Sequence, residues 1–103
     1  MNTTIIAYLT SLQNKVFKLL PMREAHDQGE DNHLYEYFDY ILSNLEGVFI
    51  EYPELNDEPV VLEVKANIVY LYNGQDIPLK KWRSIVLHSV NLLSNLIANR
   101  QEV

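Results

Sequence analysis

The sequence predicts an all-helical protein, and more closely an antiparallel four-helix bundle that forms a single domain over residues 1–103. Apolar residues recur every three or four positions in four separate segments, which is the spacing of one helix face. Polar connections separate these segments. Because each apolar face must be buried against another helix, we expect the four segments to pack together, with consecutive helices antiparallel.

The first segment covers residues 4–20 and is predicted to be a helix that Thr3 or Thr4 caps. Pro21 is expected to end it, because the residue before a proline is disfavoured in helical geometry. Residues 22–32 show no apolar periodicity and are expected to form a mobile acidic loop. The apolar face of the helix comprises Ile5, Leu9, Leu12, Val16 and Leu19.

The second segment has the clearest helical pattern of the chain and begins after Asp31 or Asn32, either of which can cap it. Its polar side carries acids, and tyrosines lie on its flanks. Residues 52–59 contain two prolines and three acids, so they are expected to break the helix and to connect it to the next segment. The apolar face comprises Leu34, Phe38, Ile41, Leu45 and Val48.

The third segment, Val60–Tyr72, fits two structures. Its Val and Ile residues suit a strand, and Asn73 with Gly74 is a common hairpin turn, so a strand is the alternative. The spacing of its apolar residues favours a helix that Asp57 caps, that Pro59 begins and that Gly74 ends. The residues with this spacing are Val61, Val64, Ile68 and Leu71.

The last segment, Leu79–Asn99, is predicted to be a long helix. Three bases in its first turn, Lys80, Lys81 and Arg83, lie where the helix dipole disfavours cations. These bases are expected to face the acidic second helix or a partner, or simply to be solvated. The apolar face comprises Trp82, Ile85, Ser89, Leu92, Leu93, Leu96 and Ile97.

Acidic residues are concentrated in the middle of the chain. The span from Arg23 to Glu63 holds twelve of the fourteen Asp and Glu residues and a single base, Arg23 itself, whereas both flanks are net basic. The net charge of −6 argues against nucleic acid or an anionic membrane as the direct partner, because both attract basic surfaces. The segregation instead predicts a partner protein with a basic surface.

The residues form no recognisable catalytic or cofactor site. The chain has no cysteine, which excludes disulfides, thiolate catalysis and cysteine-bound metals. Its three glycines are too dispersed for a phosphate-binding loop, and no serine in a glycine-flanked turn accompanies its three histidines. We therefore expect a protein that is not an enzyme and binds no cofactor.

Metal-binding and targeting signals are equally weak. Oxygen and imidazole donors cluster around the acidic loop, but their spacing matches no calcium loop, so we expect a solvated loop and no metal. The N-terminal segment resembles neither a signal peptide nor a membrane span, which predicts a cytoplasmic protein. The clustered donors are His26, Asp27, Glu30, Asp31 and His33.

One remaining group of residues combines tyrosines with acids on the second segment and the connection after it. Tyrosine offers a large contact area at a low entropy cost, and carboxylates attract a basic partner, so the group predicts a protein-binding face. The alternatives are that two or three tyrosines edge the core and that the acids only keep the surface solvated. The candidate residues are Tyr35, Glu36, Tyr37, Asp39, Tyr40, Glu46, Glu51, Tyr52 and Glu54.

Three blocks, Lys15–Glu24, Leu34–Phe38 and Ile50–Leu55, resemble small accessory proteins of bacteriophages and prophages. In that family a Lys-Val-x-Lys-Leu-Leu-Pro-Leu-x-Glu block precedes a helix, and here Met22 replaces the usual leucine. The likeness continues through Ile68–Leu71 and spans most of the chain. The family has no assigned activity. The resemblance implies a phage or mobile-element origin, in which small acidic proteins often inhibit or regulate host or defence machinery.

Together these observations predict a non-enzymatic accessory protein that binds another protein through its acidic, tyrosine-rich face. Its most concrete form is an inhibitor of a host defence or nucleic-acid-binding factor, whose groove the carboxylates would occupy in place of phosphates. One alternative is a structural or assembly protein that forms a homo-oligomer through an exposed apolar face. Another is a helical protein similar to bacteriocin immunity proteins in length and layout.

Overall fold

The computed structural model describes residues 3–30, 33–74 and 76–101, and over these residues the chain contains helices and no strand. The all-α prediction is therefore confirmed, and the third segment is a helix. The elements are α1 (Thr3–Phe17), α2 (Leu19–Asp27), α3 (Leu34–Glu51), the 3₁₀-helix η1 (Pro53–Asp57), α4 (Pro59–Asn73) and α5 (Leu79–Gln101).

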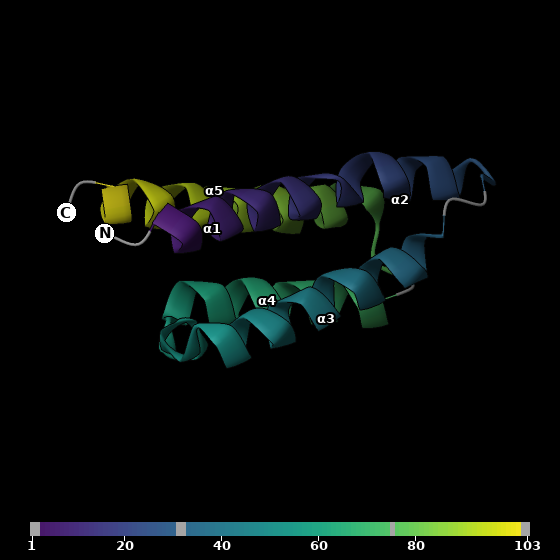
Figure 1. The fold of residues 1–103 in the computed structure, drawn as a ribbon. Coiled ribbons are helices and arrows are strands. Elements are labelled where there is room, and N and C mark those ends of the chain that lie inside the picture. The colour runs from purple at the N-terminus through teal and green to yellow at the C-terminus, as the bar shows by residue number, and fades with distance from the viewer. Residues whose placement is uncertain (1–2, 31–32, 75, 102–103) are drawn as a thin grey trace.

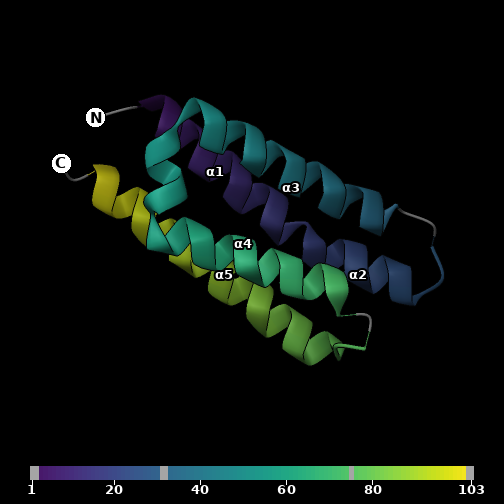
Figure 2. The ribbon, with the colours of Figure 1, turned by 90° about the horizontal axis from the view of Figure 1, so that it is seen from below.

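The helices are arranged in two layers (Figure 1). In the first layer, α1 and α2 follow each other along almost one line, and α5 packs beside both. The second layer consists of α3, η1 and α4, and Figure 2 shows it turned by 90°. The chain runs in one direction through α1 and α2 and then reverses at α3, at α4 and at α5, in a molecule that measures 44 × 23 × 18 Å.

The core lies between the layers and is built from the predicted apolar faces. Every apolar residue predicted for the first and third segments is buried. Of the five apolar residues predicted for α3, four are buried and Val48 is half-buried. The prediction for α5 missed Val86, which is fully buried, because α5 packs against α1, α2 and α4 and therefore buries a broad face. The buried residues of α5 are Trp82, Val86, Ser89, Leu93 and Leu96.

Aromatic side chains join the two layers at one end of the core. The ring of Phe38 in α3 lies 5.7 Å from that of Trp82 in α5 and 5.4 Å from that of Tyr72 in α4, edge to face in both pairs. The indole Nε1 of Trp82 donates to the backbone oxygen of Leu19 at 3.1 Å. One aromatic group therefore connects α3, α4, α5 and the start of α2.

The prediction that Pro21 ends the first helix at residue 20 was wrong, because α1 ends earlier, at Phe17, and the chain continues as a second helix, α2. Lys18, between α1 and α2, keeps right-handed helical dihedral angles (φ −63°, ψ −17°), and Pro21 is the third residue of α2. Backbone N–H groups in the first turn of a helix need no partner within that helix, so a proline is tolerated there. Residues up to Asp27 are consequently helical rather than part of a loop, and Arg23 Nε donates to Asp27 Oδ1 at 2.8 Å one turn later.

The connections differ from the predictions in two details. Glu58 rather than Asp57 caps α4, because its Oε1 accepts from the Val60 N–H at 3.4 Å while Asp57 belongs to η1. The caps predicted at Asp31 and Asn32 lie outside the described residues. Gly74 ends α4 as predicted.

Candidate protein-binding face

Charge segregates between the two layers. Residues 34–73, which form α3, η1, α4 and the connections between them, include eight acids and one base, Lys65, and are called the acidic layer here. Residues 3–27 and 79–101, which form α1, α2 and α5 with the α1–α2 connection, include two acids and seven bases and are called the basic layer. The eight acids of the acidic layer are Glu36, Asp39, Glu46, Glu51, Glu54, Asp57, Glu58 and Glu63, and the seven bases of the basic layer are Lys15, Lys18, Arg23, Lys80, Lys81, Arg83 and Arg100.

Ion pairs involving Lys or Arg are found in the basic layer. Within the described residues there are two, Arg23 Nε to Asp27 Oδ1 at 2.8 Å and Arg83 Nη2 to Glu24 Oε1 at 3.1 Å. The bases at the start of α5 therefore do not pair with the acids of α3, since Arg83 pairs with Glu24 and Lys81 lies 5.5 Å from the ring of Tyr70.

Among the described residues, carboxylates of the acidic layer lie within ion-pair distance only of histidine rings. Glu63 Oε2 lies 3.0 Å from His88 Nε2, and Glu36 Oε1 lies 3.8 Å from His33 Nδ1, with both pairs exposed to solvent. The acidic layer therefore keeps most of its negative charge unneutralised by neighbouring side chains.

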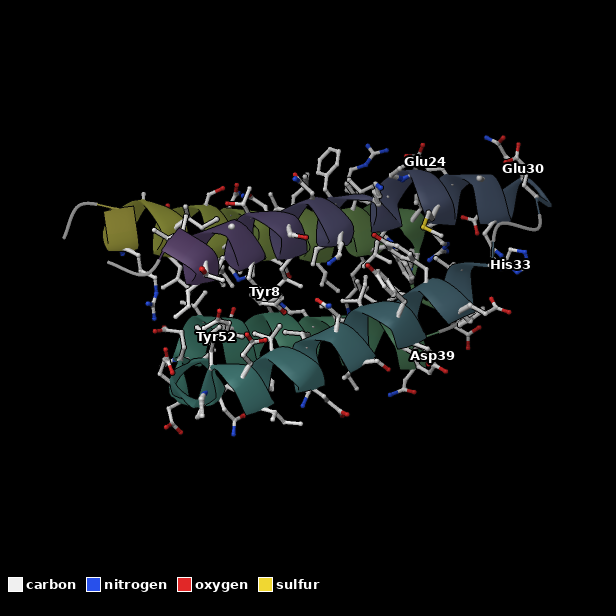
Figure 3. All side chains as sticks on the ribbon, viewed as in Figure 1. Tyr8, Glu24, Glu30, His33, Asp39 and Tyr52 are labelled. Atoms are coloured by element: carbon white, nitrogen blue, oxygen red, sulfur yellow. The ribbon has the colours of Figure 1, made fainter. Side chains whose placement is uncertain are left out.

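The acids of α3 lie on its solvent side. Glu36, Asp39 and Glu46 are all exposed, and their spacing of three and seven residues places them along one side of the helix. Figure 3 shows Asp39 on the side of α3 that faces away from the basic layer. Glu51 and Glu54 extend the exposed acids to the far end of the layer. The predicted acids are thus presented to solvent on one layer of the molecule.

Most of the predicted tyrosines edge the core instead. Tyr35 is half-buried, with its ring 5.9 Å from Tyr72 and 6.0 Å from His26. Tyr37 donates its hydroxyl to the backbone oxygen of Lys15 at 2.8 Å, and burial raises its pKa to about 12. Tyr52 is also half-buried against the core. These three side chains therefore serve packing between helices.

Tyr40 is the exposed member of the predicted tyrosines, with 53% of its surface accessible. It lies on the α1 side of α3, because the Lys15 ammonium is 5.4 Å from its ring and also contacts Asn44 Oδ1 at 3.5 Å. Asp39 lies on the α4 side, where its carboxylate accepts a hydrogen bond from Tyr72 and raises the pKa of that hydroxyl through its charge and this bond. The nine candidate residues are thus distributed around α3 rather than gathered in one patch.

The sequence prediction missed a group of exposed apolar residues on α4. Leu62 and Val69 are 40% and 37% exposed, and Ala66 between them is also exposed. A signal for this group was present, because residues 60–72 contain more apolar residues than one buried helix face needs. These residues belong to the acidic layer.

The metal donors suggested by the sequence do not form a site in the described residues. Asp27 is engaged by Arg23, the ring of His26 packs edge to face against Tyr35, and Asp31 lies outside the described residues. No group of three or more His, Asp or Glu side chains in the described part of the chain is placed to hold a metal ion.

Two hollows lie near the start of α5. The smaller, about 110 Å³, is lined by both Arg23 and Trp82, and the larger is an open depression of about 310 Å³ beside Lys81. Gly74 lines both hollows. Neither hollow is lined by any of the eight acids of the acidic layer.

Comparison with protein-family models, curated proteins and solved structures gave no significant match for this chain. The resemblance to phage and prophage accessory proteins therefore stays a prediction. None of the helices in the described residues is both long enough and apolar enough to cross a bilayer.

Proposed function

We propose that this protein is a non-enzymatic binding module, built as an antiparallel four-helix bundle, that presents its acidic layer to a basic surface on another protein. The observation that supports the proposal is the charge distribution: eight acids and one lysine in the acidic layer, and no Lys or Arg ion pair to those acids among the described residues. Charges that are not used within the fold remain available to a partner.

The electrostatics favour a partner that ordinarily binds a polyanion. Exposed carboxylates project negative potential over a Debye length of about 8 Å at physiological ionic strength, so they attract and orient a basic surface before contact. A nucleic-acid-binding protein carries such a surface, and carboxylates can occupy positions that phosphates would take. We propose inhibition of such a host factor in the cytoplasm, in keeping with the resemblance to phage and prophage proteins.

Affinity capture from a bacterial lysate tests this function. The wild-type protein is compared with a variant carrying Glu36→Lys, Asp39→Lys and Glu46→Lys, and captured proteins are identified by mass spectrometry. We expect the wild type to retain nucleic-acid-binding proteins that elute as salt is raised, and the variant to lose them. Equal retention by both proteins would contradict the proposal.

A second measurement tests inhibition directly. Each captured protein is purified with its DNA or RNA ligand, and the displacement of that ligand is followed by fluorescence anisotropy as wild type or variant is added. The proposal requires displacement by the wild type alone. Simultaneous binding of the nucleic acid and the wild-type protein would contradict inhibition by groove occupancy.

Self-association is the second candidate function, and the exposed apolar residues of α4 favour it. An exposed apolar group on a small soluble protein commonly marks a contact surface. Sedimentation equilibrium over a range of concentrations tests it, with Leu62→Ser as the variant. Self-association that this substitution abolishes would support assembly, and a monomer at the highest concentration would exclude it.

A further inference from the structure

The exposed apolar residues of α4 form a row along the helix axis. Leu62, Ala66 and Val69 are separated by four and three residues, which places them on one line over two helical turns. They lie opposite the buried face of α4, whose members are spaced in the same way. No described side chain shields these three residues enough to bury them. This apolar row is thus a helix face without a covering element.

The acids of α3 border the α4 side of the same layer. Tyr72 near the end of α4 donates its hydroxyl to Asp39, and Glu36 one turn earlier also acts electrostatically on Tyr72. Toward the other end of the two helices, the Lys65 ammonium lies 5.5 Å from the ring of Phe49. The contacts at both ends show that α3 and α4 lie side by side and antiparallel, so the acids of α3 run alongside the apolar row.

We propose that the outer face of α3 and α4 binds an amphipathic helix of the partner protein, with Leu62, Ala66 and Val69 contacting its apolar stripe and Glu36, Asp39 and Glu46 contacting lysines or arginines along one flank. This inference rests on the proposed function, because it specifies the basic element that the acidic layer would receive.

A helix matches the spacing of both rows. The acids from Glu36 to Glu46 extend over about 15 Å at 1.5 Å per residue. This spacing matches a partner helix on which a second and a third basic residue follow the first by about one turn and about three turns. Side-chain ridges of one helix pack into the grooves of another, so the apolar stripe of a partner helix can interlock with the apolar row of α4. An extended peptide would gain less binding free energy on this face, because the described residues contain no strand whose edge could pair with it.

Lys65 sets the orientation of the partner helix. It is the single base of the acidic layer and lies near Phe49, at the opposite end of the face from Asp39 and Tyr72. A partner helix therefore places a neutral or acidic residue at Lys65, since like charges repel at contact, and its basic residues beside Glu36, Asp39 and Glu46. The face consequently distinguishes the two directions in which a helix can lie on it.

The test uses synthetic peptides as probes. The first has the length of α4, 15 residues, and combines leucine, alanine and lysine so that a helix has one apolar stripe with lysines along one flank. The second has the same composition in an order that gives no stripe. Binding of each labelled peptide to the full chain is measured by fluorescence anisotropy at low and high salt, and peptide helicity by circular dichroism.

Matched variants separate apolar docking from charge attraction. Leu62→Ser with Val69→Ser removes the apolar row, while Leu87→Ser removes a leucine of the same 40% exposure from the basic layer. Asp39→Lys with Glu46→Lys reverses the charge of the acid row. The thermal midpoint of each variant is measured beside the wild type, so that a loss of folding is not mistaken for a loss of binding.

We expect the striped peptide to become helical and to bind at least about tenfold more tightly than its scrambled form. Leu62→Ser with Val69→Ser should abolish that difference, and Leu87→Ser should leave it unchanged. Equal binding of both peptides, lost only on charge reversal, would overturn helix docking and leave the proposed function standing. Failure of both peptides to bind at low salt would overturn both. If the wild-type protein self-associates and Leu62→Ser does not, the apolar row binds a second copy of the chain, and the inference is overturned.

Discussion

The two layers use their charged residues in different ways. In the basic layer, Arg23 pairs with Asp27 and stands 4.8 Å from the ring of Trp82, and Arg83 links α5 to Glu24 of α2. In the acidic layer, eight acids meet no Lys or Arg at ion-pair distance among the described residues. Charge in the basic layer thus contributes to the fold, whereas charge in the acidic layer remains available for binding.

The layers also differ in how their helices are joined. Gln13 of α1 donates to the backbone oxygen of Val90 in α5 at 3.1 Å and also contacts the Ser94 hydroxyl. In the acidic layer, Tyr35 and Phe38 of α3 contact the ring of Tyr72 in α4. The same core therefore supports one layer specialised for internal contacts and another whose outer face is left open.

The largest expected effect comes from removing the aromatic contact between the layers. Phe38→Ala deletes a fully buried ring that touches Trp82 and Tyr72, and is expected to lower the free energy of unfolding by about 3 to 5 kcal/mol. Tyr40→Ala, two positions away and exposed, should change it by less than about 0.5 kcal/mol. Urea unfolding followed by circular dichroism measures both. Similar effects for the two variants would mean that the layers are not joined through Phe38.

The crossover from α4 to the basic layer depends on Gly74. A methyl group there would lie 2.6 Å from Ile77 Cγ1 and 3.0 Å from the Tyr70 carbonyl oxygen, so Gly74→Ala is expected to destabilise the protein by about 1 to 3 kcal/mol. Gly47→Ala in the middle of α3 meets nothing within 4 Å and should stabilise it by about 0.5 to 1 kcal/mol. Thermal unfolding measures whether each variant is more or less stable than the wild type. Stabilisation by Gly74→Ala would contradict the close approach.

The contact between α3 and α1 predicts a loss of stability in alkali. Tyrosine in the unfolded chain ionises near pH 10, whereas burial raises the pKa of Tyr37 to about 12 in the folded protein. The stabilising contribution is therefore complete below about pH 10 and is lost as the pH rises through 12. Tyr37→Phe should make the fall in the urea midpoint between about pH 10 and pH 12 shallower. An equally steep fall in this variant would contradict the role assigned to Tyr37.

The smallest expected effect tests the charge difference between the layers most directly. Glu24→Ala removes the exposed ion pair with Arg83 and should destabilise the protein by about 0.2 to 1 kcal/mol. Glu46→Ala removes a carboxylate from the acidic layer and should be neutral or slightly stabilising, because it reduces repulsion among like charges. Thermal midpoints at low salt compare the two. A larger loss of thermal stability in Glu46→Ala than in Glu24→Ala would contradict the conclusion that charge stabilises the fold in the basic layer and remains free for binding in the acidic layer.

The buried faces could be predicted from the sequence because helical spacing alone determines them. In α4 the spacing of Val61, Val64, Ile68 and Leu71 decided correctly against the strand preference of its β-branched residues. The predicted helix end at Pro21 failed because a proline that ends one helix and a proline in the first turn of the next give the same pattern in sequence. The choice depends on whether the following residues find a packing partner, as α2 does against α3 and α5.

The candidate face was only partly predictable. The exposure of Glu36, Asp39 and Glu46 follows from their helical position, but the burial of Tyr37 depends on where α1 lies, and its hydroxyl partner is a backbone atom 22 residues away. The separation of charge into two layers likewise requires the topology, because it depends on η1 and α4 returning beside α3. Leu62 and Val69 were overlooked because a search for chemistry gives no weight to exposed apolar residues.

The layered charge also gives the protein a permanent dipole moment that runs from one layer to the other, with the negative end on α3, η1 and α4. A positively charged body nearby therefore exerts a torque on the molecule as well as an attraction. Tumbling is biased so that the same side arrives first, which raises the share of productive collisions above that of a uniformly charged sphere of equal net charge.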